Sequence, residues 1–178
     1  GLPETRAQQK KARVTNKPAD WWGFKRWIKV RSHEAPDVAD ETLFDGQLAR
    51  KAQQVMRENK DRPFFLAAGF FRPHLPFVAP RKYFDLYPPE EIQLPENRQP
   101  PTDDVAEALH DSPELRSYSD ISRQGELSED LQRRLLQAYY ACVSYVDAQI
   151  GLMLSEIEQL GLAERTIVVL WSDHGYHL

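Results

Sequence analysis

The sequence has little cysteine and no long hydrophobic run, and each shortage excludes a class of structure. Its 178 residues contain one cysteine, Cys142, which can form neither an internal disulfide nor a multi-thiolate metal site. The longest apolar run, residues 64–71, covers eight residues, whereas a helix that crosses a bilayer needs about 20. We therefore predict no disulfide scaffold, no zinc finger and no membrane span.

Charge of one sign is not in large excess either, but it is unevenly distributed. The net charge is −4, yet residues 1–31 carry nine Lys or Arg against two Asp or Glu. Cations beside Trp21, Trp22 and Trp27 can bind an anionic glycan or a nucleic acid. No nucleic-acid-binding motif accompanies them, so we expect no nucleic-acid partner. We predict that residues 1–36 form a basic, irregular segment, for which a solvated loop is the simpler interpretation.

The sequence also contains few candidate strands. Two short apolar runs, residues 64–70 and 166–171, predict buried strands. An average sheet has about five or six strands, and the sequence shows neither an initiator methionine nor a leader segment. We therefore expect an internal piece of a longer chain. Residues 37–178 are predicted to form part of one α/β domain, with the remaining strands in polypeptide outside this sequence.

Helix and connection patterns surround the first predicted strand. Residues 45–59 place apolar side chains on one helical face, and Pro63 prevents the helix from continuing. Ten of the thirteen prolines lie within residues 63–113, which excludes regular helix or central strand there. The aromatic residues of this stretch predict a long connection that packs and has a function.

A second, longer helix is predicted before the second strand. Ser128 is a candidate N-cap and Gly161 a candidate C-terminal stop. Large apolar residues recur between them at steps of three or four, which predicts a buried stripe. Cys142 lies on that stripe without a neighbouring histidine or basic residue, so we interpret it as a small buried residue and not as a nucleophile.

Two polar residues, Asp173 and His174, follow the second predicted strand. Ligands bind outside the carboxyl ends of strands in open α/β sheets. A carboxylate beside an imidazole can ligate a divalent ion, and Gly175 gives the backbone freedom to turn both side chains toward one point. A capping aspartate with a surface histidine is the alternative interpretation. One Asp–His pair is only half a site, so we expect further ligands from elsewhere.

A third candidate, His74, lies just beyond the first predicted strand, between Pro73 and Pro76. A histidine whose backbone is fixed in this way can contact an anion or protonate a leaving group at neutral pH. The alternative is a histidine whose ring is satisfied by a backbone carbonyl. The remaining ionisable candidates have no placement at a strand end, and we expect solvated surface for His33, His110, Glu90, Glu91, Asp103 and Asp104.

Two long motifs resemble type I sulfatases, especially their iduronate-2-sulfatase-like branch. The first is residues 62–77, Arg-Pro-Phe-Phe-Leu-Ala-Ala-Gly-Phe-Phe-Arg-Pro-His-Leu-Pro-Phe. The second combines residues 139–151 with residues 166–175, which end in Ser-Asp-His-Gly. The resemblance covers residues 37–178. It implies an α/β, alkaline-phosphatase-like fold with a mostly parallel sheet flanked by helices, and a sulfatase, an enzyme that hydrolyses sulfuric esters.

The resemblance also implies roles for the candidate residues. Asp173 and His174 would be metal ligands, and His74 would contact the sulfate ester and help to protonate the departing oxygen. The family's nucleophile is a formylglycine made from the cysteine of a Cys-x-Pro-x-Arg motif. That motif is absent here, and Cys142 does not match it. We expect a divalent cation, Ca²⁺ in the first instance, and a formylglycine in polypeptide outside this sequence. The piece alone is expected to be inactive.

Two other functions stay open at this point. Calcium prefers oxygen ligands, whereas the nitrogen of His174 suits Mn²⁺ or Zn²⁺, so a phosphoester or phosphonate hydrolase of the same superfamily is the first alternative. A non-catalytic, sulfatase-like protein that binds an anionic glycan is the second. The expected partner is a sulfated carbohydrate or another small sulfate ester. The resemblance implies a periplasmic, secreted or lysosomal location, and no oligomeric state is predicted.

Overall fold

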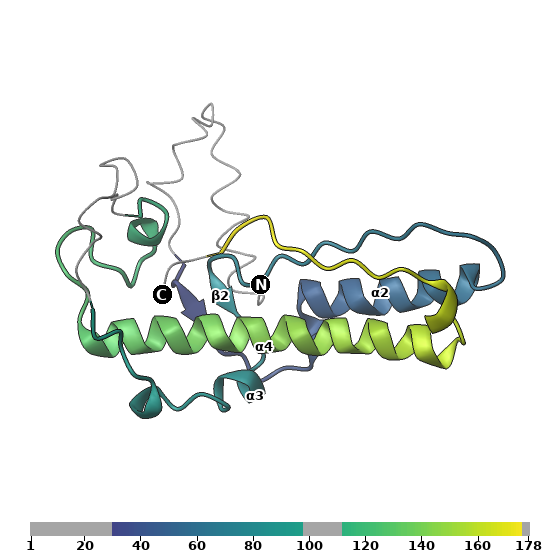
Figure 1. Cartoon of the computed structure of the whole chain (residues 1–178). Helices are drawn as coiled ribbons and strands as arrows, with labels where there is room; N and C mark the ends of the chain where they lie inside the picture. Colours follow the sequence, from purple (N-terminus) through teal and green to yellow (C-terminus); the bar gives the residue numbers. More distant parts are fainter. Residues whose placement is uncertain (1–29, 98–111, 176–178) are drawn as a thin grey trace.

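Two long helices form the frame of the structure. The computed structural model describes residues 30–97 and 112–175. Figure 1 shows α2 (Phe44–Asn59) and α4 (Glu129–Gln159) side by side. The backbone N–H of Gly46 donates to the Tyr145 hydroxyl, and Arg57 donates to Glu156 eleven residues further along both helices. The two helices therefore run in the same direction.

Short elements surround this pair of helices. The strands β1 (His33–Glu34) and β2 (Phe77–Val78) pair in parallel, with His33 opposite Phe77. In the described residues they form a sheet of two strands. No helix there is long and apolar enough to cross a membrane. The other short elements are α3 (Arg81–Phe84), η2 (Asp40–Thr42), η3 (Pro89–Glu91), η4 (Leu115–Ser117) and η5 (Ala163–Arg165).

Both predicted helices are present, and their caps are those expected from the sequence. The Ser128 hydroxyl accepts a hydrogen bond from the Leu131 N–H at 3.3 Å, and Gly161 follows α4 with a φ of 64°. The most buried positions of α4 include the polar Gln149 and Glu156. A hydrophobic stripe does not predict the burial of these two polar side chains, because it depends on hydrogen bonds to other parts of the chain.

The described part of the proline-rich connection from residue 77 to residue 92 packs against α4, as its aromatic residues predicted. Phe77 and Tyr83 are buried, and their rings lie 5.7 Å from Tyr139 and 5.5 Å from Tyr145 respectively. Burying an aromatic side chain stabilises a fold by about 1.5–3 kcal/mol. This packing attaches β2 and the loop before it to α4. Some sequence predictions lie outside the described residues, namely those for Trp21, Trp22, Trp27, His110, Asp103 and Asp104.

The two predicted strands are unpaired and exposed in the part of the chain that the structure describes. Residues 64–70 and 166–171 form no ladder with the described residues. Phe65 is 93% exposed and Ile167 is 92% exposed. Figure 1 shows both segments, coloured teal and yellow, running back along the helices from the same end. A buried strand needs neighbours for its backbone groups and side chains, and the described residues do not supply them.

Candidate functional site

His74 lies in the loop that joins residues 64–70 to β2. Its backbone N–H donates to the Phe71 carbonyl oxygen at 3.1 Å, and its Nδ1 lies 2.8 Å from the Leu75 carbonyl oxygen. Since a carbonyl oxygen can only accept, the proton in this bond belongs to Nδ1. The side chain is 45% exposed. The ring can therefore meet a ligand through Nε2 while Nδ1 stays bonded to the protein.

Two further groups flank the His74 ring. The Glu114 carboxylate places Oε1 3.8 Å from Nδ1, which is an ion-pair distance when the ring is protonated. The Phe71 ring lies 5.3 Å from the imidazole, centroid to centroid. The Leu75 carbonyl, the Glu114 carboxylate and the Phe71 ring together restrict how the imidazole can turn.

The loop around His74 is braced by Asp45 and Arg72, which the sequence analysis did not identify. The Asp45 carboxylate accepts hydrogen bonds from the backbone N–H groups of Phe71, at 2.8 Å, and Arg72, at 3.1 Å. The Arg72 guanidinium donates to the carbonyl oxygens of His74 and Val78, both at 3.0 Å. One sequence feature could have identified Asp45 as a bonded, buried group: it is an acidic residue on the buried side of an amphipathic helix.

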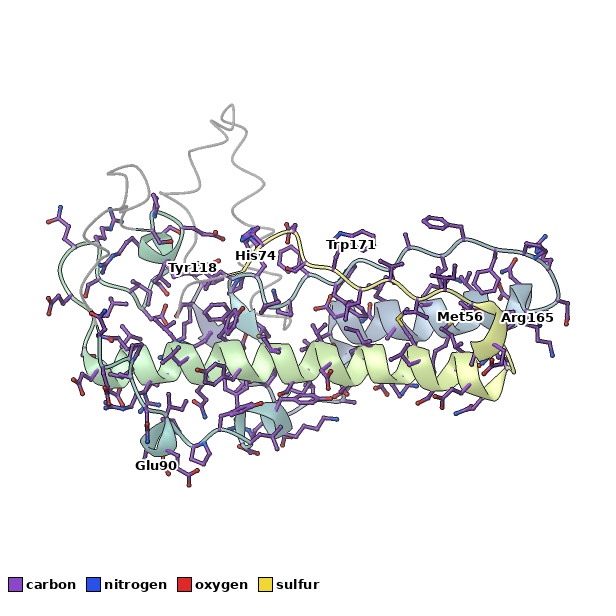
Figure 2. The ribbon with its side chains drawn as sticks, in the orientation of Figure 1. Met56, His74, Glu90, Tyr118, Arg165 and Trp171 are labelled. Carbon is purple, nitrogen blue, oxygen red and sulfur yellow. The ribbon has the colours of Figure 1, made fainter. Side chains whose placement is uncertain are left out.

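Asp173 and His174 lie together beyond the end of residues 166–171. Asp173 Oδ1 accepts from the His174 backbone N–H at 3.0 Å, and Asp173 Oδ2 lies 4.0 Å from His174 Nε2. Their side chains are 90% and 67% exposed. Figure 2 shows the neighbouring Trp171 on the same side of α4 as His74, with Glu90 on the opposite side. Both candidate groups are thus open to ligands from outside.

The Asp173–His174 pair fits part of a metal site. Two ligands of one cation, each about 2.0–2.6 Å from it, can be at most about 5 Å apart, and the 4.0 Å separation satisfies this limit. A carboxylate and an imidazole suit a divalent cation. Among residues 30–97 and 112–175, no group of three or more His, Cys, Asp or Glu is arranged to hold a metal. The expectation of further ligands from elsewhere stays a prediction.

His33 is not on the solvated surface, so that expectation is wrong. Its side chain is 20% exposed and Nδ1 lies 3.6 Å from Asp120 Oδ2. Burial lowers the pKa of His33, although the charge of Asp120 opposes this. The fully buried Ser32 donates from its hydroxyl to Asp120 at 2.9 Å and from its backbone N–H at 2.7 Å. The Ser32 hydroxyl is committed to the carboxylate, so this cluster ties β1 to the segment after η4.

Cys142 is a buried thiol, and Glu90 and Glu91 are surface carboxylates. Burial raises the pKa of the Cys142 thiol to about 12, so little of it is thiolate at neutral pH. Glu90 and Glu91 are exposed in η3, as the sequence predicted.

Comparison with known proteins finds a sulfatase family model and several relatives that are named as sulfatases. The family model described as sulfatase matches residues 4–178. A sulfatase of Formosa agariphila is 38% identical over 143 residues, which cover 79% of this chain and 27% of the relative. The iduronate 2-sulfatase of Mus musculus is 36% identical over 153 residues, covering 82% and 28%. That of Homo sapiens is 37% identical over 150 residues, covering 80% and 27%.

The chain therefore spans little more than a quarter of the length of these curated relatives. The match to the family model, by contrast, extends over nearly all of the chain. The resemblance that the sequence motifs predicted is confirmed: this chain belongs to the sulfatase family.

Proposed function

We propose that the full-length protein is a metal-dependent hydrolase of sulfuric esters that acts on a sulfated sugar. Family membership supports the reaction, and the names of the iduronate 2-sulfatase relatives support a sugar substrate. The observation that carries the proposal is the geometry of His74. Its Nδ1 is bonded to the Leu75 carbonyl and its ring is half-exposed, so Nε2 is presented to a ligand.

In this proposal His74 supplies a proton to the departing oxygen of the ester. In the protonated ring, Nδ1–H stays bonded to the Leu75 carbonyl while Nε2–H donates to the leaving oxygen. The ring is then neutral with its Nδ1 proton in place, so its orientation does not change during the transfer. Glu114, 3.8 Å from Nδ1, balances the charge of the protonated ring.

Asp173 and His174 would hold the divalent cation that sulfatases use. We propose Ca²⁺, with Mn²⁺ or Zn²⁺ as the ions that a nitrogen ligand favours more strongly. When bound, such a cation polarises the sulfate oxygens and stabilises the charge that develops on them. The carboxylate contributes the negative charge and the imidazole a neutral donor. The other ligands and the formylglycine nucleophile would come from polypeptide outside this sequence.

We also propose that residues 64–70 and 166–171 are strands of a mostly parallel sheet flanked by helices. Each segment follows a long helix, and the two run in the same direction in Figure 1. Arg165 donates to the Lys60 carbonyl oxygen at 3.1 Å, so the turns that precede the segments are in contact. Additional strands would cover the exposed apolar side chains. The family further supports a periplasmic, secreted or lysosomal location as part of this proposal.

The test uses the full-length protein, its metal content and its turnover of sulfate esters. We expect Asp173→Ala to remove the metal and most of the activity, because one lost charged ligand leaves the cation undercompensated. The matched control is Asp147→Ala, which removes an exposed carboxylate from α4. It should change neither quantity.

Unchanged metal content and turnover in Asp173→Ala would contradict the proposed role of this residue. Substrate preference tests the reaction itself. We expect sulfated uronate sugars to be hydrolysed faster than matched phosphate esters. Faster turnover of the phosphate esters would contradict the proposed function.

A further inference from the structure

A buried carboxylate holds the loop that carries His74. Asp45 is 2% exposed, and its two oxygens accept the backbone N–H groups of Phe71 and Arg72. These donors lie two and three residues before His74. Hydrogen bonds to a carboxylate are shorter and stronger than bonds between neutral groups. Asp45 therefore fixes the point at which the extended segment 64–70 passes into the loop.

The position of Asp45 is itself set by α4. The neighbouring Gly46 donates its backbone N–H to the Tyr145 hydroxyl at 2.7 Å, and that hydroxyl donates to the Asp40 carbonyl at 2.9 Å. Tyr145 is fully buried in α4. A Cβ atom on Gly46 would clash with the Asp40 carbonyl oxygen, so the backbones of α2 and η2 approach too closely for any side chain there. The first turn of α2 is therefore bonded to α4 through Tyr145 and packed tightly against η2.

These contacts form a continuous path to the candidate proton donor. We propose that Asp45 is a positioning residue of the enzyme, which acts by placing His74 and not by touching the substrate. The inference rests on the proposed function, because it assigns Asp45 a task in that reaction. Asp45 transmits the rigid position of α4 through Phe71 and Arg72 to the loop. Arg72 then closes the loop by donating to the His74 carbonyl oxygen.

The effect of losing Asp45 follows from the need for accurate placement. A displacement of a catalytic group by about 1 Å can cost about 10²-fold in rate. In Asp45→Asn the amide keeps one acceptor oxygen and turns a donor NH₂ toward the other backbone N–H. The loop loses one hydrogen bond and gains a repulsion. The charge and shape of the ligand-binding surface stay the same, because Asp45 is buried.

The chain offers a matched control in Glu156. This carboxylate is also buried, at 3% exposure, and it also bridges two parts of the structure. It accepts from Arg57 at 2.7 Å and from Gln53 at 3.2 Å, at the opposite end of α2 from Asp45. Glu156→Gln therefore perturbs a buried carboxylate on the same helix pair without changing the His74 loop.

The first measurement does not depend on activity. Hydrogen exchange of the full-length protein reports the amide protons of Phe71 and Arg72. We expect Asp45→Asn to accelerate their exchange by about tenfold or more, the factor that corresponds to one lost hydrogen bond. Glu156→Gln should leave it unchanged. Should Asp45→Asn fail to fold, Asp45→Ser retains one acceptor and is measured in the same way.

The second measurement is steady-state kinetics in a double-mutant design. We expect Asp45→Asn to lower kcat by about 10–100-fold with KM changed less than about threefold. In the His74→Ala background the same substitution should have no further effect, because the group that it positions is gone. Glu156→Gln should lower thermal stability without this loss of kcat.

Three results would overturn the inference. One is unchanged exchange at Phe71 and Arg72 in Asp45→Asn. Another is an Asp45→Asn effect that adds fully to that of His74→Ala. The third is an equal loss of kcat in Glu156→Gln, since activity would then follow stability alone. A full-length protein that hydrolyses no sulfate ester would instead overturn the proposed function, and the exchange result would still decide whether Asp45 holds the loop.

Discussion

The two halves of the candidate site differ in how this chain supports them. His74 lies in a loop fixed by Asp45, Arg72 and the Leu75 carbonyl, and that loop leads into β2, which is buried against α4. Asp173 and His174 lie at the end of an extended segment, and their side chains are 90% and 67% exposed. The described residues therefore hold His74 in place by themselves. They hold the side chains of Asp173 and His174 much less closely.

Apolar side chains also differ in burial between the proline-rich connection and residues 166–171. In the proline-rich connection Phe77, Tyr83 and Phe84 are buried, whereas the apolar side chains of residues 167–171 are exposed. Composition is thus similar and burial is opposite. Hydrophobic residues are buried only where a complementary surface is present, so the exposed segments indicate where the described chain lacks neighbours.

The largest expected effect on activity concerns His74. In the full-length protein we expect His74→Ala to lower kcat by about 10²–10⁴-fold, the usual contribution of a positioned proton donor. Steady-state kinetics with a sulfated sugar is the measurement. His33→Ala is the control, since it removes a histidine from β1, next to β2, and should affect stability but not kcat. A loss below about threefold would make His74 a structural residue.

The exposed segments provide the next test. If residues 166–171 form a strand of a larger sheet, Ile167→Ala in the full-length protein should destabilise it by about 2–5 kcal/mol. Chemical denaturation measures this change. Leu86→Ala is the control, because Leu86 is also exposed, at 60%, and belongs to the connection that already packs on α4. It should cost less than about 0.5 kcal/mol. An equally small cost for Ile167→Ala would contradict the proposed sheet.

A smaller effect is expected where the first turn of α2 packs against η2. Gly46→Ala places a Cβ atom against the Asp40 carbonyl oxygen, and overpacking of this kind costs about 1–3 kcal/mol. Gly151 in α4 is the matched control, since a Cβ atom there meets nothing within 4 Å. Gly151→Ala should stabilise the protein by about 0.5–1 kcal/mol through helix propensity. Thermal unfolding of both variants measures the difference, and equal signs would contradict the close approach.

The smallest effect is a dependence of stability on pH. Burial opposes ionisation of Asp40, but hydrogen bonds from Lys82, Tyr83 and Gln149 outweigh it and lower the pKa of the carboxyl. A group with a lowered folded-state pKa stabilises the fold above its unfolded value, 3.8. That contribution is lost as the pH falls through the folded value. Solvent screening keeps this loss smaller than the other effects expected here.

Urea denaturation at a series of pH values between neutral and strongly acidic checks this prediction. Asp40→Asn is the reference, because it lacks the titrating carboxyl. The variant should show a smaller decrease in stability on acidification than the original protein. Parallel curves for the two proteins would show that the ionisation of Asp40 is not coupled to folding.

Much of the local structure could be predicted from the sequence because it depends on neighbours along the chain. The periodicity of residues 45–59 predicted α2, and Ser128 and Gly161 predicted the ends of α4, which the structure confirms. The candidates His74, Asp173 and His174 were identified by their positions after apolar segments and by family motifs. Their proposed roles remain to be tested.

Other features could not be predicted because they join residues distant in sequence. Asp45 accepts hydrogen bonds from the backbone N–H groups of Phe71 and Arg72, which lie 26 and 27 residues further along the chain. His33 appeared to be a surface residue, yet it contacts Asp120. The parallel pairing of β1 with β2 likewise joins segments with no common pattern.

The two helices, the packing of Phe77 and Tyr83 and the family could all be predicted from residue order, because each depends on short spans of sequence or on long contiguous motifs. The three-dimensional fold was needed to show which polar groups are buried, how the His74 loop is held and which apolar segments have neighbours. These properties depend on contacts between parts of the chain that are distant in sequence. The composition or residue spacing of one part does not reveal which other part it will contact.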